Sequence, residues 1–298
     1  MLFEYVVIIG VGLIGGSLAR ALRRAGACAR ITGVGRHEAN LKRALELGVI
    51  DDYQLDTADA VKDADLIVLA TPLSTTESLL QGLQNSLKPD AIITDVGSAK
   101  GSVVNAARAS LGERFGRFVP AHPIAGTEQS GVDASFAELF DDHLVILTPV
   151  KETDEQAIAA ITQMWEECGA RVVNMDVDQH DRILAATSHL PHMLAYALVD
   201  CLAEMEEREE IFRFAAGGFR DFTRIASSSP LMWHDVCLAN RDSLLTVLDD
   251  FQEHLARVRA AVAGNDGARL LEIFNRARQA RDDFIRRRGG QAALDTDE

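Results

Sequence analysis

The chain has 298 residues, and its 30 basic and 45 acidic side chains give a formal net charge of −15. This length predicts about two domains. A hydrophobic fraction of 47% with 25% charged residues is typical of a folded globular protein and excludes disorder as the main state. The acidic balance argues against nucleic acid or a membrane surface as the main partner, because both attract basic faces. We therefore expect a small-molecule substrate, held by local arginines if it is an anion.

The cysteine pattern and the hydropathy predict a cytoplasmic protein. No CxxC pair occurs, so neither a zinc site nor a disulfide framework is indicated. An apolar strand begins almost at the first residue and leaves no separate signal peptide. No apolar run reaches the roughly 18 residues that a membrane helix requires. Reduced thiols are expected at Cys28, Cys168, Cys201 and Cys237.

Strand and helix patterns alternate over residues 1–175. An apolar run at 3–9 ends at a glycine, and helical spacing follows over 13–25. This alternation predicts a parallel sheet covered on both faces, as in α/β proteins. Further strands are expected at 31–34, 66–70, 91–94, 118–119, 144–147 and 171–174, with helices at 40–47, 102–111 and 155–168.

The pattern becomes helical throughout from residue 176 to about 288, with breaks near 217–218, 227–230 and 264–267. The small and polar residues 289–298 predict a frayed, disordered tail. We therefore expect two domains, an α/β domain over 1–175 and an all-helical domain over 176–298. Dinucleotide-dependent enzymes of this size often dimerise through such a helical half, so a homodimer is expected by analogy of fold.

The strongest local motif follows the first strand and opens the first helix. Gly10 permits the tight turn, Gly12 lets the backbone approach a pyrophosphate, and Gly15 lets the helix pack closely on the strand. Leu13 and Ile14 complete this GxGxxG loop. A purely structural glycine turn is the alternative, but the strand–turn–helix context favours a Rossmann-like dinucleotide site.

The end of the second strand predicts which dinucleotide is used. An acidic residue that would bond the ribose of NAD is expected about 20 residues after the loop, but position 35 is glycine. Gly35 removes the repulsion of a 2′-phosphate, and Arg36, followed by His37, can pair with that phosphate. NADP is therefore expected to be preferred over NAD. Alternatively, Arg36 is a solvated residue that stacks on adenine, and both cofactors are used.

Two side chains that follow strands are candidates for catalysis. Ser98 either caps the next helix or points its hydroxyl toward the nicotinamide. Lys100 lies near the start of that helix, where it is either solvated or close to an anion. His122 precedes a glycine-rich loop at the cofactor edge, and imidazole is well suited to take a proton near neutral pH. A satisfied core histidine is the alternative for His122.

A second histidine cluster lies on a predicted helix. His189 and His192 are three residues apart, so they share one face, and Ser188 precedes them. Pro191 is expected to kink the helix and turn the pair. No third ligand with matching spacing accompanies the two histidines, so a metal site is the minority interpretation and none is predicted.

Two arginines beside a glycine break are candidates for binding an anion. Arg220 and Arg224 are four residues apart, and guanidinium matches a carboxylate with two parallel hydrogen bonds. Alternatively, Asp221 forms an internal ion pair with one of them.

Together these segments resemble the prephenate and arogenate dehydrogenases of tyrosine biosynthesis, also called cyclohexadienyl dehydrogenases. The resemblance covers nearly the whole chain in the family's order. It is carried by GVGLIGGS at 10–17, ATP at 70–72, DVGSAK at 95–100, HPIAGTEQSG at 122–131, SHLPH at 188–192 and GFRDFTRIA at 218–226.

The resemblance implies a Rossmann-like domain followed by a helical dimerisation domain. It also implies the NAD(P)-dependent oxidative decarboxylation of prephenate to 4-hydroxyphenylpyruvate, or of arogenate to tyrosine. Within that reaction His122 would take the proton of the ring hydroxyl, and Ser98 would orient that histidine and the nicotinamide. His192, with His189 and Ser188, would line the substrate pocket, and Arg224 would pair with a substrate carboxylate. Thr71 and Pro72 belong to a matching motif at the cofactor edge.

Two rival functions are weighed against this one. A β-hydroxyacid dehydrogenase needs a catalytic lysine on its helical domain, and no lysine follows Lys151. A non-catalytic protein that senses NADP would need the glycine loop, but not His122, Arg224 and the SHLPH segment together. The sequence does not decide between prephenate and arogenate.

Overall fold

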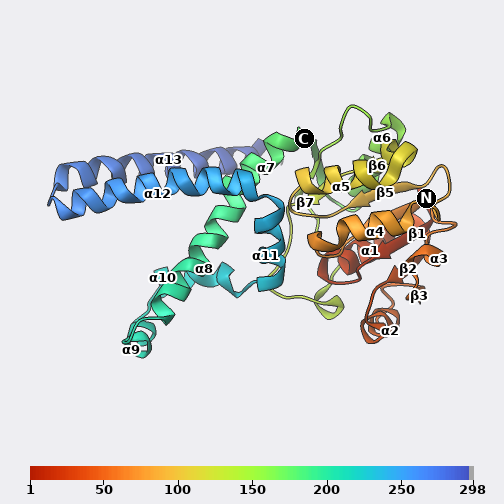
Figure 1. The fold of residues 1–298 in the computed structure, drawn as a ribbon, viewed down its shortest axis with the longest axis horizontal. Helices are drawn as coiled ribbons and strands as arrows, with labels where there is room; N and C mark the ends of the chain where they lie inside the picture. The colour runs from red at the N-terminus through yellow and green to blue at the C-terminus, as the bar shows by residue number, and fades with distance from the viewer. Residues whose placement is uncertain (295–298) are drawn as a thin grey trace. The chain divides into compact units, whose positions relative to one another are not determined.

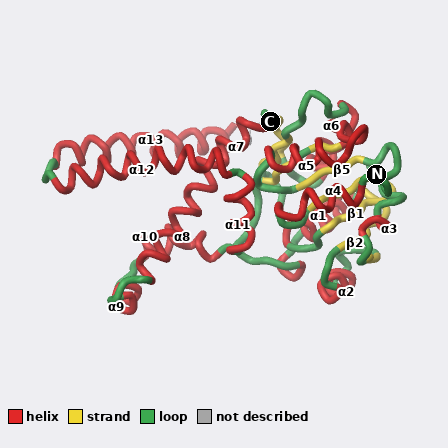
Figure 2. The backbone as a smooth tube through the Cα atoms, in the orientation of Figure 1, coloured by secondary structure: helices red, strands yellow, loops and turns green. Residues whose placement is uncertain are grey.

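The computed structural model describes residues 1–294, and its first compact unit spans Met1–Leu244, with a second unit beginning at Leu245. All strands of the described chain precede residue 175, and the chain is helical from there on (Figures 1 and 2). This confirms the predicted change from α/β to all-helical structure. The first unit contains both kinds of structure, so the domain boundary at 175/176 stays a prediction.

The main sheet has six parallel strands in the order β3-β2-β1-β4-β5-β6. The chain builds one side of the sheet from β1 to β3 and then crosses to β4 on the other side of β1. Such a reversal leaves a crevice at the carboxyl ends of the strands, where α/β proteins bind ligands. The strands are β1 (Phe3–Ile9), β2 (Cys28–Val34), β3 (Asp52–Gln54), β4 (Leu66–Leu69), β5 (Ile92–Asp95) and β6 (Phe118–Val119).

Alternate side chains of β1 enter the cores on opposite faces of this sheet. Val6 and Ile8 pack with one group of buried residues, and Val7 and Ile9 pack with the other. The first face is covered by α1 (Leu13–Ala25) and α6 (Glu155–Glu167), and the second by α4 (Thr76–Leu83) and α5 (Gly101–Leu111). The remaining elements of the α/β part are α2 (Glu38–Glu46), α3 (Thr57–Ala60), and the short helices η1 (Leu73–Thr75), η2 (Gly112–Arg117) and η3 (Val132–Ala134).

A second sheet was not expected from the sequence. It has three strands, β7 (Ala121–Pro123), β8 (Leu144–Leu147) and β9 (Arg171–Asn174), with β7 antiparallel to β8. The sequence places His122 just after a strand and before a glycine-rich loop, whereas in the structure His122 is itself the middle residue of β7 and pairs with Ile146. This pairing fixes its backbone on a strand.

The helical part of the first unit begins with one nearly continuous run. It consists of α7 (Val177–Leu184), the π-helical turn η4 (Ala185–His189) and α8 (Leu190–Ala203), which has Pro191 in its first turn. The change in pitch thus falls just before Pro191, at the histidine cluster. The remaining elements are α9 (Arg208–Arg213), α10 (Gly217–Thr223), η5 (Arg224–Ser227) and α11 (Pro230–Ala239), and their bounds confirm the predicted breaks near 217–218 and 227–230.

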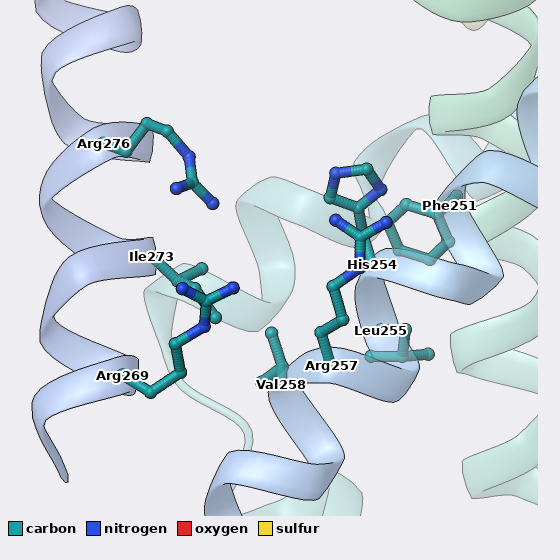
Figure 3. Close-up of a pocket in the computed structure, with 8 residues that line it drawn as sticks. All are labelled: Phe251, His254, Leu255, Arg257, Val258, Arg269, Ile273 and Arg276. Carbon is teal, nitrogen blue, oxygen red and sulfur yellow. The ribbon is translucent and has the colours of Figure 1, made fainter. Parts of the chain in front are cut away.

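Two long helices end the described chain, α12 (Arg241–Ala263) and α13 (Gly267–Leu294), and they run antiparallel (Figure 1). Their side chains line a groove (Figure 3). Residues 289–294 continue α13, where the sequence predicts a frayed tail; residues 295–298 lie outside the described chain. No described helix has both the length and the apolar character to cross a membrane. The groove is lined by Phe251, His254, Leu255, Arg257, Val258, Arg269, Ile273 and Arg276.

Candidate active site

The glycine loop lies at the carboxyl end of β1, beside the end of β4. Gly10 has a φ of +100°, and a Cβ there would lie 2.4 Å from the carbonyl oxygen of Ala70. A Cβ on Gly15 would lie 2.1 Å from the carbonyl oxygen of Gly10. Gly12, by contrast, faces open space, with nothing within 4 Å of an added Cβ. Two glycines are therefore required by packing, and the third leaves room for a ligand, which fits a dinucleotide pyrophosphate.

The other predicted cofactor residues follow strands next to this loop. Leu13 and Ile14 open α1, and Thr71 and Pro72 follow β4, which pairs with β1. The amide of Gly10 donates to the carbonyl oxygen of Val34 at 2.8 Å, so the end of β2 lies beside the loop. There a Cβ on position 35 would make only ordinary contacts with Leu41. The structure brings the predicted cofactor residues to one edge of the sheet.

Arg36 and His37 are exposed at the end of β2. Among the residues whose side chains are described, none forms a hydrogen bond or ion pair with Arg36. Its guanidinium is therefore available to a ligand at this edge.

A buried ion pair anchors the turn that carries Ser98. The Lys100 ammonium, fully buried, donates to Asp95 at 2.5 Å and to the carbonyl oxygen of Ala121 at 2.7 Å. The predicted alternative of a solvated Lys100 is therefore wrong, and the alternative of a nearby anion is confirmed. Asp95 also accepts from the amides of Gly97 and Ala121. These contacts tie β5 and the start of α5 to β7, so the Ser98 turn and His122 share one support.

His122 is buried and forms one end of a chain of hydrogen bonds. Its Nδ1 lies 2.8 Å from Nε2 of His180, and Nδ1 of His180 lies 2.8 Å from a carboxylate oxygen of Asp181. The carboxylate accepts further hydrogen bonds from the amides of Lys100 and Gly101, each at 2.8 Å. Among the described residues none hydrogen-bonds to Nε2 of His122, so this nitrogen is available to a substrate.

The second histidine cluster surrounds Trp233 of α11. The ring of His192 stacks on Trp233 with centroids 3.7 Å apart, and His189 meets it edge-on at 6.0 Å. The two histidines thus share a face, as predicted. Nδ1 of His192 donates to the carbonyl oxygen of Ser188 at 2.9 Å, which leaves its Nε2 as an acceptor. The Ser188 side chain itself is half-buried.

The protonation of His189 follows from its neighbour Asn240. The Asn240 amide nitrogen donates to the carbonyl oxygen of Asp181 at 2.8 Å and lies 3.1 Å from Nδ1 of His189. That nitrogen of His189 must therefore accept, and the ring carries its proton on Nε2. Neither this N–H nor the indole N–H of Trp233 forms a close hydrogen bond within the described residues, although both are buried, and the backbone of Ser98 lies near enough to His189 to act on its pKa. Two unpaired donors of this kind fit an oxygen atom of a bound ligand.

The three histidines are neutral at pH 7. Burial is the main cause that lowers the pKa of His122 well below its usual value, and the neighbouring His180 and the Lys100 ammonium add to it. Burial also lowers the pKa of His189 to about 4, against the opposing charge of Asp181. The pKa of His192 is lowered by burial as well. Neutral imidazole is the form that acts as a base.

The two predicted arginines lie in different surroundings. Arg224, at the start of η5, forms an ion pair with Glu128 of the loop that follows His122. Arg220 lies on α10, and its side chain is 85% exposed. Its Nε lies 3.9 Å from a carboxylate oxygen of Asp221. Among the described contacts none joins Arg220 to the histidine cluster. The structure therefore links Arg224, but not Arg220, to the segment that carries His122.

Sequence motifs did not indicate His180, Asp181, Trp233 or Asn240. The only available signal was weak: His180 and Leu184 are four residues apart and share the buried face of α7. Taken together, the site offers a buried neutral base, unpaired N–H donors and a glycine crevice. This combination suits hydride transfer to a dinucleotide coupled to removal of a hydroxyl proton. Among the described residues no group of three or more histidine, cysteine or acidic side chains is arranged for a metal ion.

Comparison with known proteins identifies related families and structures. Residues 18–174 match the family model for the nucleotide-binding domain of prephenate dehydrogenase, and residues 176–276 match the model for its dimerization domain. A cyclohexadienyl dehydrogenase of Zymomonas mobilis is 43% identical over 94% of this chain and 95% of its own. A prephenate dehydrogenase of Bacillus subtilis is 38% identical over 96% of this chain and 78% of its own.

A solved structure gives the same picture. The crystal structure of prephenate dehydrogenase from A. aeolicus, in complex with hydroxyphenyl propionate and NAD+, superimposes with a TM-score of 0.88 and 36% sequence identity. The match covers 94% of this chain and 98% of that one.

Proposed function

This chain belongs to the prephenate dehydrogenase family, and from that premise we propose a role for each part of its site. It is an oxidoreductase that uses a nicotinamide cofactor. The reaction is the oxidative decarboxylation of prephenate or arogenate, in which the ring of the substrate becomes aromatic. The observation that carries the assignment is His122, a buried neutral imidazole whose Nδ1 is bonded to His180 and whose Nε2 is free.

His122 is the general base of this reaction. Its Nε2 accepts the proton of the substrate's ring hydroxyl while the hydroxyl carbon is oxidised. A bound nicotinamide supplies the acceptor for the hydride that leaves this carbon. Ser98, in the turn that Lys100 anchors, orients the substrate hydroxyl and His122. A positioned general base contributes about 10²- to 10⁴-fold to the rate.

The remaining predicted residues bind the substrate. The unpaired N–H of His189 and the free Nε2 of His192 present one donor and one acceptor, with Ser188 beside them. Arg224 binds the side-chain carboxylate, exchanging Glu128 for the substrate. Firm binding of the carboxylate that is lost would stabilise the ground state and slow its departure. Arg220 draws the anion toward the site from its exposed position, against the net charge of −15.

The finer choice of cofactor is NADP over NAD. The absence of a carboxylate at Gly35 and the unpaired, exposed guanidinium of Arg36 support this preference. Arg36→Ala is expected to raise the KM for NADP by about tenfold or more, because a charge-assisted pair contributes about 1.5–3 kcal/mol. The KM for NAD should change little. Equal losses for both cofactors would show that Arg36 does not bind the phosphate.

The protein acts as a homodimer in the cytoplasm. The match of residues 176–276 to a dimerization domain supports the assembly. Exposed apolar side chains on α12 and α13 also support it, among them Leu255, Leu271 and Phe274.

The test is a two-by-two assay with prephenate or arogenate, each with NAD or NADP, in which nicotinamide reduction is followed by absorbance. Turnover in at least one combination is expected, highest with NADP, and the best combination identifies the substrate. His122→Asn should lower kcat by about 10²- to 10⁴-fold in that combination. Cofactor binding without turnover in all four would instead favour the NADP-sensing function.

A further inference from the structure

Two buried side chains next to the proposed base have no role in the function described so far. His180 is fully buried, and its ring meets that of His122 edge-on with centroids 5.1 Å apart. Asp181, the next residue along α7, is also buried. The hydrogen bonds His122 Nδ1–His180 Nε2 and His180 Nδ1–Asp181 are both 2.8 Å long. These distances require one proton in each bond.

The chemistry of the partners determines where these protons lie. An ionised carboxylate only accepts hydrogen bonds, so Nδ1 of His180 must donate to Asp181. A neutral imidazole carries a single N–H, and in His180 the bond to Asp181 places that N–H on Nδ1. Nε2 of His180 is then an acceptor, and Nδ1 of His122 must donate to it. It follows that the proton of neutral His122 is on Nδ1 and that Nε2 carries the lone pair.

Several hydrogen bonds fix the position of Asp181, so that it can determine where the protons of His180 and His122 lie. Its two oxygens accept from the amides of Lys100 and Gly101 at the start of α5, each at 2.8 Å. Its backbone carbonyl accepts from Asn240. Burial acts to raise the pKa of Asp181, but the hydrogen bonds from His180 and from the amides of Lys100 and Gly101 lower it below its usual value, so the carboxylate stays ionised. The carboxylate cannot rotate away from His180 without leaving two amides unpaired.

The other titratable groups around His122 do not compete for its Nδ1. Lys100, from the start of α5, is already bonded to Asp95 of β5 and to the carbonyl oxygen of Ala121. His189, from η4, is engaged at Nδ1 by Asn240. His180 is therefore the sole partner of Nδ1 of His122 among the described residues.

We propose that His180 and Asp181 are positioning residues that hold His122 in the tautomer with its proton on Nδ1 and its lone pair on Nε2. The inference rests on the proposed role of His122 as the base. When Nε2 takes the substrate proton, the bond from Nδ1 to His180 becomes charge-assisted and therefore stronger. The negative charge of Asp181, at the end of the chain, favours the same cation. The arrangement thus assists proton removal without touching the substrate.

The first experiment reads the tautomer directly, by long-range ¹H–¹⁵N NMR of the histidine rings at neutral pH. The protein has eight histidines, and the signals of His122 are identified by their loss in His122→Asn. The expected pattern is a protonated Nδ1 and an unprotonated Nε2. A protonated Nε2 on His122 would overturn the proposal, whatever the activity of the enzyme. Conversely, failure of the proposed function would appear as absent turnover with the predicted tautomer intact.

Variants test whether His180 imposes the tautomer. His180→Leu removes the acceptor and should lower kcat by about 10²-fold or more, with little change in KM, while the Nε2–H tautomer of His122 appears. His180→Gln should restore most of the loss. Its amide group can donate to Asp181 and accept from His122 at the same time, as the imidazole does. Asp181→Asn should resemble His180→Leu, because an asparagine no longer forces His180 to donate toward it.

His143→Leu is the matched control, since His143 is exposed and lies on the turn before β8. It should leave both kcat and the spectrum of His122 unchanged. A merely structural role for His180 predicts equal losses in His180→Leu and His180→Gln, with the tautomer of His122 unaltered in both. That result would contradict the proposal. Cofactor binding by each variant reports whether the α/β part is folded.

Discussion

Burial of His122 determines how the activity should depend on pH. In the proposed mechanism the neutral imidazole of His122 is the active form, and protonation at low pH removes the base. Because the pKa of His122 is held well below its usual value, this loss should occur at a lower pH than for an exposed histidine. We therefore expect kcat/KM to stay constant as the pH falls through 6.5, the usual pKa of histidine, and to decrease only below it. A pH profile of kcat/KM provides the measurement, and a midpoint at or above 6.5 would contradict the prediction.

Arg224 should affect the substrate and not the cofactor. Its guanidinium pairs with Glu128 on the loop after β7, the segment that carries His122, and not with the glycine loop proposed to bind the cofactor. Arg224→Ala should raise the KM for the cyclohexadiene acid by about tenfold or more, because hydrogen bonds between charged groups contribute about 1.5–3 kcal/mol.

Steady-state kinetics with each substrate varied in turn separates the two effects. The KM for NADP should change little in Arg224→Ala. Arg213→Ala is a suitable control, because Arg213 is an exposed arginine of α9 whose ion pair is local to that helix. A large rise in the KM for NADP would show that Arg224 serves the cofactor instead.

At this scale the sequence predicts residues that lie in distinctive motifs and misses those that act through packing. Gly10 and Gly15 were predicted because a sharp turn and a close approach require glycine, and the structure gives both reasons. His180 and Asp181 form an ordinary pair of polar residues on a helix, and only tertiary structure places them behind His122. Lys100 shows the same limit, since its pairing with Asp95 depends on how the turn folds back.

Among the secondary-structure elements, α11 depends on one buried carboxylate for its attachment to the α/β part. Asp235 is 5% exposed and accepts from both the amide and the hydroxyl of Ser74 in η1. Asp235→Ala leaves these donors without their partner, so the free energy of unfolding should fall by about 1–2 kcal/mol. Urea denaturation followed by circular dichroism measures the change.

The neighbouring residue supplies the control for this prediction. His234 also contacts Asp235, but its side chain is 63% exposed. His234→Ala should change the free energy of unfolding by less than about 1 kcal/mol, as is usual for exposed pairs. Equal destabilisation by the two variants would show that the contact with Ser74 does not hold α11 in place.

Elements with a strong periodic signal were predicted almost residue by residue, as for α1 and β9. Some short elements were missed, although the two-residue strand β6 was predicted at its observed bounds. β3 and β7 have three residues each, too few to show an alternating pattern, and they form because a neighbouring strand offers hydrogen bonds. The π-helical turn η4 likewise has no sequence signal of its own, yet it contains His189.

For the whole molecule, the hydropathy pattern predicts where strands give way to helices, but it does not predict which elements pack into one compact unit. The change to helical structure lies where hydropathy placed it, but compactness groups α7–α11 with the sheet. The reason is visible in the contacts: Asp181 of α7 bonds to the start of α5, and Asp235 of α11 bonds to Ser74. Such long-range pairings leave no trace in the periodicity of either segment.

Exposed apolar side chains on the second unit provide a test of the proposed dimer. Phe274 of α13 is 55% exposed, and Leu255 of α12 and Leu271 of α13 are exposed to similar extents. Apolar surface of this kind gains about 2–3 kcal/mol per large side chain when it is buried. Phe274→Asp removes this favourable free energy and adds a carboxylate, which would lose its hydration if the surface were buried in a dimer. The dissociation constant of the dimer should rise by roughly 30- to 100-fold or more.

Analytical ultracentrifugation over a range of protein concentrations measures this constant. Gln279→Asp, an exposed polar position on the same helix, adds the same charge without removing apolar surface and should leave the dimer intact. If Phe274→Asp dimerises as tightly as Gln279→Asp, the apolar side chains of α13 are not the dimer interface. Loss of the dimer in both variants would point to general charge repulsion, which added salt should then reverse.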